Sequence, residues 1–356
     1  MKNNEIGYKS LSSAINGLRF PLILMIVMLH CYSSVKLPAG DHSTFFSIVY
    51  PFGLWMGETG VPAFFFISGF LFFFSQKSYL RKIKSRFSTL FVPYLIWNSV
   101  ILLAYVVLMF LGRPQEIAGK SIADYGFTDY LLAYVNRGQW DHGNGVPMLC
   151  PYWYVRNLMI LCLASPIVYY LVKWSKGLVL IVLFVWWLSA HHNAMLQASL
   201  LFFSLGAYFS IEEKNPLTFM KRHCKLCLAL WVVCSVADII SHSIISFEGN
   251  FIIHRISLLV NIFGFILITD LCLNKFKFLN NELLSKSSFW IFTVHYPLVI
   301  VIRSACMKYF ADGSDMLHIL LFFVSVVVIT VICIMAYQIL MKIWPSFIRI
   351  TTGNRG

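Results

Sequence analysis

Charged residues are scarce in this chain. Only 12% of its 356 residues are Asp, Glu, Lys or Arg, whereas 59% belong to the apolar set of Ala, Val, Ile, Leu, Met, Phe, Trp, Tyr and Cys. Soluble domains carry roughly twice that share of charge, so a water-soluble globule is excluded. Internal repeats, low-complexity tracts and lipidation motifs are also missing. We therefore predict one membrane-embedded domain over residues 1–356.

The apolar runs predict an all-α, polytopic integral membrane protein. A helix crosses the hydrocarbon core of a bilayer with roughly 17 to 25 apolar residues. The chain contains about ten such runs, of which the fifth and sixth are the weakest. They cover residues 15–35, 51–74, 89–111, 151–172, 178–191, 194–211, 225–243, 251–270, 288–306 and 317–340.

Acidic residues are few, and basic residues are distributed unevenly. The chain has 28 Lys and Arg against 15 Asp and Glu, a net charge of +13. With a cytoplasmic N-terminus, the ten spans place about nineteen Lys and Arg inside and six outside, as the positive-inside rule requires. We predict cytoplasmic termini, a basic cytoplasmic loop at 75–88 and a long external loop at 112–150. Membrane topology thus explains the charge, so we expect membrane lipids and no nucleic acid as partners.

Cysteine forms no recognisable metal-binding framework. Several of the nine cysteines lie inside apolar runs, where a thiol usually acts as a small hydrophobic side chain. His223, Cys224 and Cys227 have a CxxC spacing, but no second ligand pair accompanies them, and a structural zinc ion normally takes four ligands. We therefore predict no metal site.

Ionisable residues inside the spans are the most informative feature, because they are costly in hydrocarbon and normally face a polar cavity or another helix. They are Arg19, His30, Glu58, Arg156, Asp238, Arg255 and His295. For His295, which Pro297 follows closely, we expect a hydrogen bond to a freed backbone carbonyl. For Arg156 we expect the side chain to extend to the membrane interface.

Arg19 and His30 are the strongest catalytic candidates. Eleven residues at about 100° each return to within roughly 20° of a whole number of turns, so both side chains lie on one helix face, about 16 Å apart along the axis. Arg19 is placed near the cytoplasmic boundary, where it could neutralise an entering anion. His30 is a base that titrates near neutral pH and lies toward the outer half of the bilayer.

A small-residue patch and a basic cluster follow in the second span and the loop after it. Ser68 and Gly69 lie among phenylalanines, and allow close approach of another helix or of a slim ligand arm. The segment from Arg81 to Arg86 is the densest basic cluster of the chain. Such clusters commonly contact anionic lipid, and this one could also bind the phosphates of a cofactor.

These residues resemble the acyltransferase-3 family of integral membrane O-acyltransferases. The resemblance rests on Arg19 and His30, separated by ten residues, on FFFISGF at 64–70 and on RFSTLFVPYLIWN at 86–98. Weaker similarity continues in PYWYVRNLMIL at 151–161, LLFFSLGAYF at 200–209 and SFWIFTVHYPL at 288–298, so that it spans nearly the whole chain.

The resemblance implies a ten-helix bundle that takes an acyl group, usually acetyl, from cytoplasmic acyl-CoA. It implies delivery to a hydroxyl of a glycan or lipid-linked saccharide outside the cytoplasmic membrane of a bacterium. The family's essential arginine and histidine correspond to Arg19 and His30. Its arginine pair before the third helix is present only in part, because Arg86 matches the first member and Thr89 occupies the second.

We accordingly expect the CoA phosphates at Arg86, with Lys82 or Lys84 supplying the missing charge, and the pantetheine arm beside Ser68 and Gly69. His30 would act as general base or as a covalent acyl carrier.

On the acceptor side, Glu58 could orient a histidine or pair with a basic neighbour. Tyr152 and Trp153 could stack on a sugar, although an interfacial aromatic belt also explains them.

Two other classes of function stay open. In an ion-coupled transporter or glycan flippase, His30, Glu58, Asp238 and Arg255 would form a relay, although no internal repeat supports this. In a membrane scaffold or receptor, the polar residues would only fix helix packing. The identity of the acceptor glycan and of the acyl group does not follow from these residues.

Overall fold

Helices account for most of the chain. A computed structural model describes residues 2–33, 35, 37–117, 119–140, 143–190, 194–243, 249–273 and 275–354. The helices are α1 (Lys2–Ser33), α2 (Ser43–Tyr50), α3 (Gly60–Phe74), α4 (Tyr79–Arg86), α5 (Val92–Phe110), α6 (Phe127–Leu132), α7 (Trp153–Leu163), α8 (Ser165–Ser175), α9 (Leu178–Ser189), α10 (Met195–Ile211), α11 (Pro216–Arg222), α12 (Cys224–Ser243), α13 (Asn250–Cys272), α14 (Glu282–Phe310), α15 (Asp315–Ile343) and α16 (Pro345–Thr351). Two short antiparallel pairs complete the fold, β1 (Glu116–Ile117) with β2 (Lys120–Ser121) and β3 (Gly138–Trp140) with β4 (Gly143–Val146).

Seven helical segments in the described residues are long and apolar enough to cross a membrane. They are Ser10–Ser33, Ser43–Phe74, Tyr79–Phe110, Cys224–His242, Asn250–Cys272, Glu282–Phe310 and Asp315–Ile343. Two of these segments combine several elements. In Ser43–Phe74, a π-helical turn at Pro51–Met56 continues α2 in the direction of α3, and in Tyr79–Phe110, a π-helical turn at Phe87–Phe91 joins α4 to α5. The all-α, multi-pass prediction is confirmed.

By length and composition, the described residues contain seven candidate spans, or up to nine if two bent helix pairs are each counted as one span. The chain bends by 67° between α7 and α8, next to Pro166, and by 83° between α10 and α11, next to Pro216. The fifth predicted span is the twelve-residue α9, which rises about 18 Å and is shorter than the roughly 30 Å hydrocarbon core. The predicted count of about ten spans and the location of the termini therefore stay predictions.

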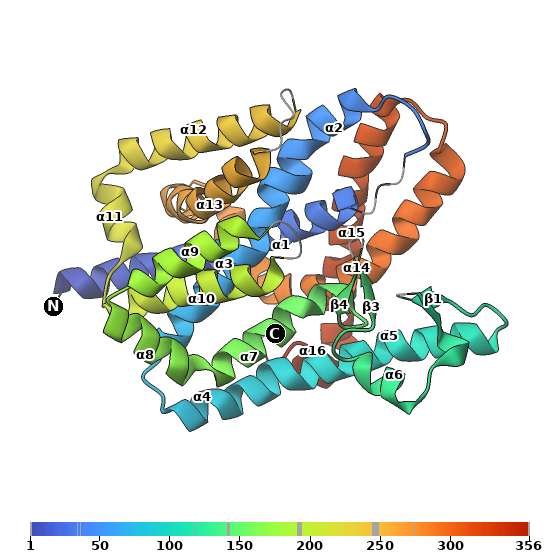
Figure 1. The fold of residues 1–356 in the computed structure, drawn as a ribbon, viewed down its shortest axis with the longest axis horizontal. Coiled ribbons are helices and arrows are strands. Elements are labelled where there is room, and N and C mark those ends of the chain that lie inside the picture. The colour runs from blue at the N-terminus through green and yellow to red at the C-terminus, as the bar shows by residue number, and fades with distance from the viewer. Residues whose placement is uncertain are drawn as a thin grey trace.

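Helix α1 runs through the middle of the bundle, with α5 along one edge and α12 along the opposite edge (Figure 1). It packs against α3, α13, α14 and α15. Helices α3 and α10 pack closely because each has a glycine at the contact. A Cβ atom on Gly69 of α3 would collide with the carbonyl of Phe203 on α10, and a Cβ atom on Gly206 of α10 would collide with the carbonyl of Phe66 on α3. Gly69 is thus explained by helix packing.

The polar region 112–150 folds against α5. Ile117, Ile122 and Met148 bury their side chains with Leu102 of α5. Arg156 of α7 holds this region in place, since its Nη1 donates to the carbonyls of Val135 and, at 2.8 Å, of Gly145. The expectation that Arg156 extends to the membrane interface stays a prediction. The half-buried guanidinium supplies donors to loop carbonyls that need them, which satisfies both groups.

Candidate active site

A cavity of about 240 Å³ lies between α1, α3, α4, α7 and α14. Its polar lining comprises Arg19, Ser68, Arg86, Ser285, Lys286 and Ser288. Phe64, Phe289 and Phe292 supply aromatic walls. The fold thus brings together Arg19, Ser68 and Arg86, three of the residues that we predicted as site residues from separate parts of the chain.

Three cations converge on this cavity, and two of them lack an anionic partner. Within the described parts of the chain, neither Arg19 nor Arg86 has a carboxylate oxygen within 4.0 Å. Lys286 is 2.8 Å from Glu282, one turn earlier on α14, in a largely exposed pair. Half-buried guanidinium groups without carboxylates attract an anion, and phosphate suits their geometry.

Lys286 was missed in the sequence analysis, where it counted only as a cytoplasmic charge. It lies 267 positions after Arg19, and no local spacing relates the two residues. The neighbouring serines, Ser285, Ser287 and Ser288, would have been the only local signal of a polar helix end.

Lys82 and Lys84 do not line the cavity. Lys82 Nζ lies 5.1 Å from the ring centroid of Phe72, where Arg86 also contacts the ring, at 5.9 Å. Lys84 is exposed on α4. Gly69 is absent from the lining as well. Of the predicted donor residues, therefore, Arg86 and Ser68 lie at the cavity and the other three do not.

His30 lies beyond the cavity, in the last turn of α1. Its ring centroid is 5.2 Å from that of His295 and 5.0 Å from that of Tyr296, both on α14. Phe292 connects the two places, because it lines the cavity and its ring centroid is 6.2 Å from that of His295. A pair of histidines therefore lies one helical turn past the aromatic wall.

The structure defines the tautomer of His295. Its Nδ1 lies 2.9 Å from the carbonyl oxygen of Ile291, which only accepts hydrogen bonds, so Nδ1 carries the proton and Nε2 has a free lone pair. Nε2 is buried, and no described residue offers it a hydrogen bond. His295 does bond a backbone carbonyl, but the prediction of a freed carbonyl is wrong: the acceptor is Ile291, whereas Pro297 deprives the carbonyl of Thr293 of its amide.

Glu58 belongs to a second polar cluster, which we call the His254 cluster: Glu58, Asp238 and His254. His254 Nε2 is 3.0 Å from Glu58 Oε2, and its Nδ1 is 2.8 Å from Asp238 Oδ2. Both ring nitrogens face carboxylates, so both must donate. Tyr50 also donates to Asp238, at 3.1 Å. The histidine oriented by Glu58 in this cluster is thus His254, which the sequence analysis did not single out.

The two predicted sugar platforms are packed inside the bundle to different degrees. The ring of Tyr152 is fully buried, stacked on Tyr94 and on Phe292, and its hydroxyl is 2.9 Å from Thr293 Oγ1. It therefore has no open face for a sugar. Trp153 is half-buried, with its ring centroid 6.0 Å from that of Phe65.

Comparisons with known proteins agree with the resemblance. Residues 12–338 match the acyltransferase-3 family model, which is described as an acyltransferase domain. The chain is also similar to the succinoglycan biosynthesis protein ExoH of Rhizobium meliloti (strain 1021), with 24% identity over 365 residues that cover 97% of this chain and 93% of ExoH. No solved structure matches.

The family match includes α1, α3 and α14, the helices that supply Arg19, Ser68 and Lys286 to the cavity. It extends over nearly the whole chain, and the apolar helices agree with a multi-pass membrane protein. The chain therefore belongs to the acyltransferase-3 family, whose members transfer acyl groups.

Proposed function

We propose that this protein is a membrane O-acyltransferase that moves an acyl group, acetyl by family resemblance, from cytoplasmic acyl-CoA to a hydroxyl of a cell-envelope polysaccharide or lipid-linked saccharide. The bacterial cytoplasmic membrane is its proposed location. The cavity carries the proposal, because it combines cations from three helices with an aromatic wall that leads to a histidine pair.

The donor fits this cavity by charge and by polarity. Arg19, Arg86 and Lys286 offer positive charge to the phosphates of CoA at the cavity. Ser68, whose Oγ lies 3.1 Å from the hydroxyl of Tyr154, provides a polar contact along the path of the pantetheine arm. The thioester would then pass Phe292 to reach the histidines.

The chemistry needs one base and one thioester. His30 takes the proton of the acceptor hydroxyl as its oxygen attacks the thioester carbonyl. The C–S bond breaks and CoA leaves as a thiol after it gains a proton. His295 presents its Nε2 lone pair to this region, and would hold His30 in a productive orientation or accept a proton from it. A covalent acyl-His30 intermediate would follow the same bond changes in two steps.

The acceptor class is supported by the likeness to a succinoglycan biosynthesis protein. A transporter or flippase is not favoured, because the family is named for acyl transfer.

Purified protein supplied with labelled acetyl-CoA and an envelope glycolipid extract tests the proposal. We expect label in the saccharide and release of CoA. His30→Ala should lower turnover by about 10²–10⁴-fold, the usual contribution of general-base catalysis. His223→Ala, at an exposed helix end, is the matched control and should retain wild-type turnover. Full transfer by His30→Ala, or solute movement without thioester consumption, would contradict the proposal.

A further inference from the structure

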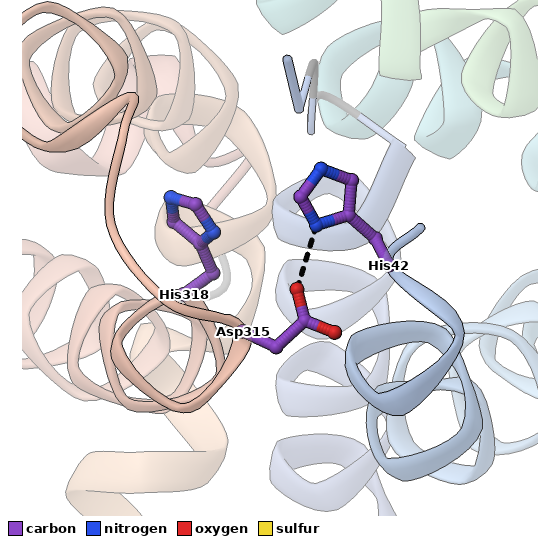
Figure 2. Close-up of side chains that lie close together, drawn as sticks. All are labelled: His42, Asp315 and His318. Carbon is purple, nitrogen blue, oxygen red and sulfur yellow. Dashed lines mark hydrogen bonds and ion pairs between the residues drawn. The ribbon is translucent and has the colours of Figure 1, made fainter. Parts of the chain in front are cut away.

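A third polar cluster lies at the end of the bundle where α1 terminates, and neither the cavity nor the His254 cluster includes it. His42 directly precedes α2, while Asp315 and His318 lie on the first turn of α15. Figure 2 shows the three side chains facing one another across the space between these elements. One potential ligand atom from each residue lies within 4.8 Å of the others.

The Nε2 hydrogen bonds of the two histidines leave Nδ1 of each ring facing the cluster; in His42 this nitrogen pairs with Asp315 Oδ1, and in His318 it has no partner among the described residues. His318 Nε2 lies 2.9 Å from the carbonyl oxygen of Phe310, and His42 Nε2 lies 3.1 Å from that of Pro38. A carbonyl only accepts, so each Nε2 carries a proton, and the neutral ring then has its lone pair on Nδ1. Histidines that bind metals characteristically donate their other N–H to a carbonyl in this way.

His318 provides the observation that points to a missing ligand. His318 is 1% exposed, and its Nδ1 is buried with no hydrogen-bond partner in the part of the chain that the structure describes. In Figure 2 the ring nitrogen nearer the other two side chains points toward them. A buried nitrogen lone pair without a donor is costly, because its water has been removed and nothing replaces it. A cation between Nδ1 and the carboxylate would remove that cost.

Asp315 contributes the negative charge. Its Oδ1 is 2.6 Å from His42 Nδ1, and its Oδ2 accepts from the amide of Phe45 at 2.9 Å. The hydrogen bond from the Phe45 amide fixes the orientation of the carboxylate. The pairing with His42 places Asp315 Oδ1 and His42 Nδ1 next to each other. If His42 is neutral with Nε2 protonated, two lone pairs face each other at this distance, which a shared cation would stabilise.

We propose that His42, Asp315 and His318 form a binding site for a divalent transition-metal ion, best suited to Zn²⁺. Two imidazole nitrogens and one carboxylate oxygen are a donor set that zinc commonly uses, with the fourth tetrahedral position left to water. Zinc bonds of about 2.0–2.2 Å require ligand atoms roughly 3.3–3.6 Å apart. On binding, His42 Nδ1 and Asp315 Oδ1, which lie 2.6 Å apart, would therefore release the proton between them and separate by about 0.7–1.0 Å, and the His318 ring would shift toward them.

The bound ion would link the segment before α2 to the turn between α14 and α15. These are the elements that follow His30 and His295 in the chain. The site would thereby cross-link the bundle end nearest the proposed catalytic histidines. It does not depend on acyl transfer, so either proposal can fail alone.

Zinc titration of the full-length protein in detergent, after chelator treatment, tests this site. The background carries Cys224→Ser and Cys227→Ser to remove the CxxC thiols as competing ligands. A chromophoric chelator measures affinity and stoichiometry. We expect one Zn²⁺ per chain and, by X-ray absorption, two imidazole nitrogens at about 2.0–2.1 Å. Asp315→Asn and His318→Gln should each weaken binding at least tenfold. His223→Gln is the matched control and should bind as the background does.

A background protein without stoichiometric Zn²⁺ binding would overturn the proposal and leave the cluster as an ion pair between protonated His42 and Asp315. Binding that persists at full affinity in both variants would overturn it too. If a variant elutes as an aggregate in size-exclusion chromatography, the X-ray absorption spectrum of the background protein decides: two imidazole ligands support the site, and a sulfur or all-oxygen shell contradicts it.

Discussion

The cavity and the His254 cluster use similar residue types in opposite ways. At the cavity, Arg19 and Arg86 have no carboxylate partner among the described residues. In the His254 cluster, one histidine has a carboxylate on each ring nitrogen. An ionisable group that lacks a partner is poised for a ligand, whereas one that the protein has already neutralised stabilises packing. The comparison teaches that an intramembrane charge indicates function only once its partners are known.

The largest effect on stability should come from breaking the His254 cluster. Asp238 is fully buried, so Asp238→Asn leaves His254 with less compensation, and loss of one partner of a buried pair typically costs about 3–5 kcal/mol. We expect a clear fall in the melting temperature in detergent. Glu58→Gln is the matched control, with a smaller fall, because the Glu58 side chain is 42% exposed. Equal melting temperatures for wild type and Asp238→Asn would show that the cluster does not stabilise the fold.

Removing a cavity cation should, in contrast, lower the activity and leave the stability of the fold unchanged. Arg86→Ala should raise the KM for acyl-CoA about tenfold or more, since a charge-assisted hydrogen bond contributes about 1.5–3 kcal/mol. Its saturated rate should change less. Lys84→Ala, on the same helix but exposed and outside the lining, is the matched control. If both substitutions change KM equally, general surface charge and not the cavity attracts the donor.

The smallest effect on the melting temperature should come from replacing Asp129, a paired carboxylate outside the membrane spans. Lys120 donates to Asp129 at 2.5 Å and Arg137 lies 2.6 Å away; the Lys120 hydrogen bond is the main reason why the pKa of Asp129 is lowered. A lowered pKa contributes stability above the unfolded value of about 3.9, and this contribution disappears as the pH falls through the folded value. The melting temperature of wild type should therefore exceed that of Asp129→Asn at pH 6 and approach it near pH 3. A gap that is constant across this range would contradict the assignment.

Local patterns in the sequence predicted the helical membrane fold and part of the cavity. Arg19, Ser68 and Arg86 each lie in a recognisable local segment, and the structure brings them together. Lys286 and His254 were missed because the residues that they meet, the cavity cations Arg19 and Arg86 for Lys286 and the carboxylates of the His254 cluster for His254, lie on other elements far away in the sequence. The burial of Tyr152 and the anchoring role of Arg156 depend on tertiary packing, which a single span does not reveal. The helices bend next to Pro166 and Pro216, and the length of an apolar run alone did not show that these bends change the number of candidate spans.

The central claim is that the cations of the cavity bind the phosphates of the acyl donor. Equilibrium binding of CoA and of phosphate-free pantetheine to the same purified protein measures this directly. Wild type should bind CoA more tightly by at least about a hundredfold, and Arg19→Gln combined with Arg86→Ala should lose most of that difference while binding pantetheine as before. If the double variant kept the full preference for CoA, the phosphates would bind elsewhere and the account of the cavity would be wrong.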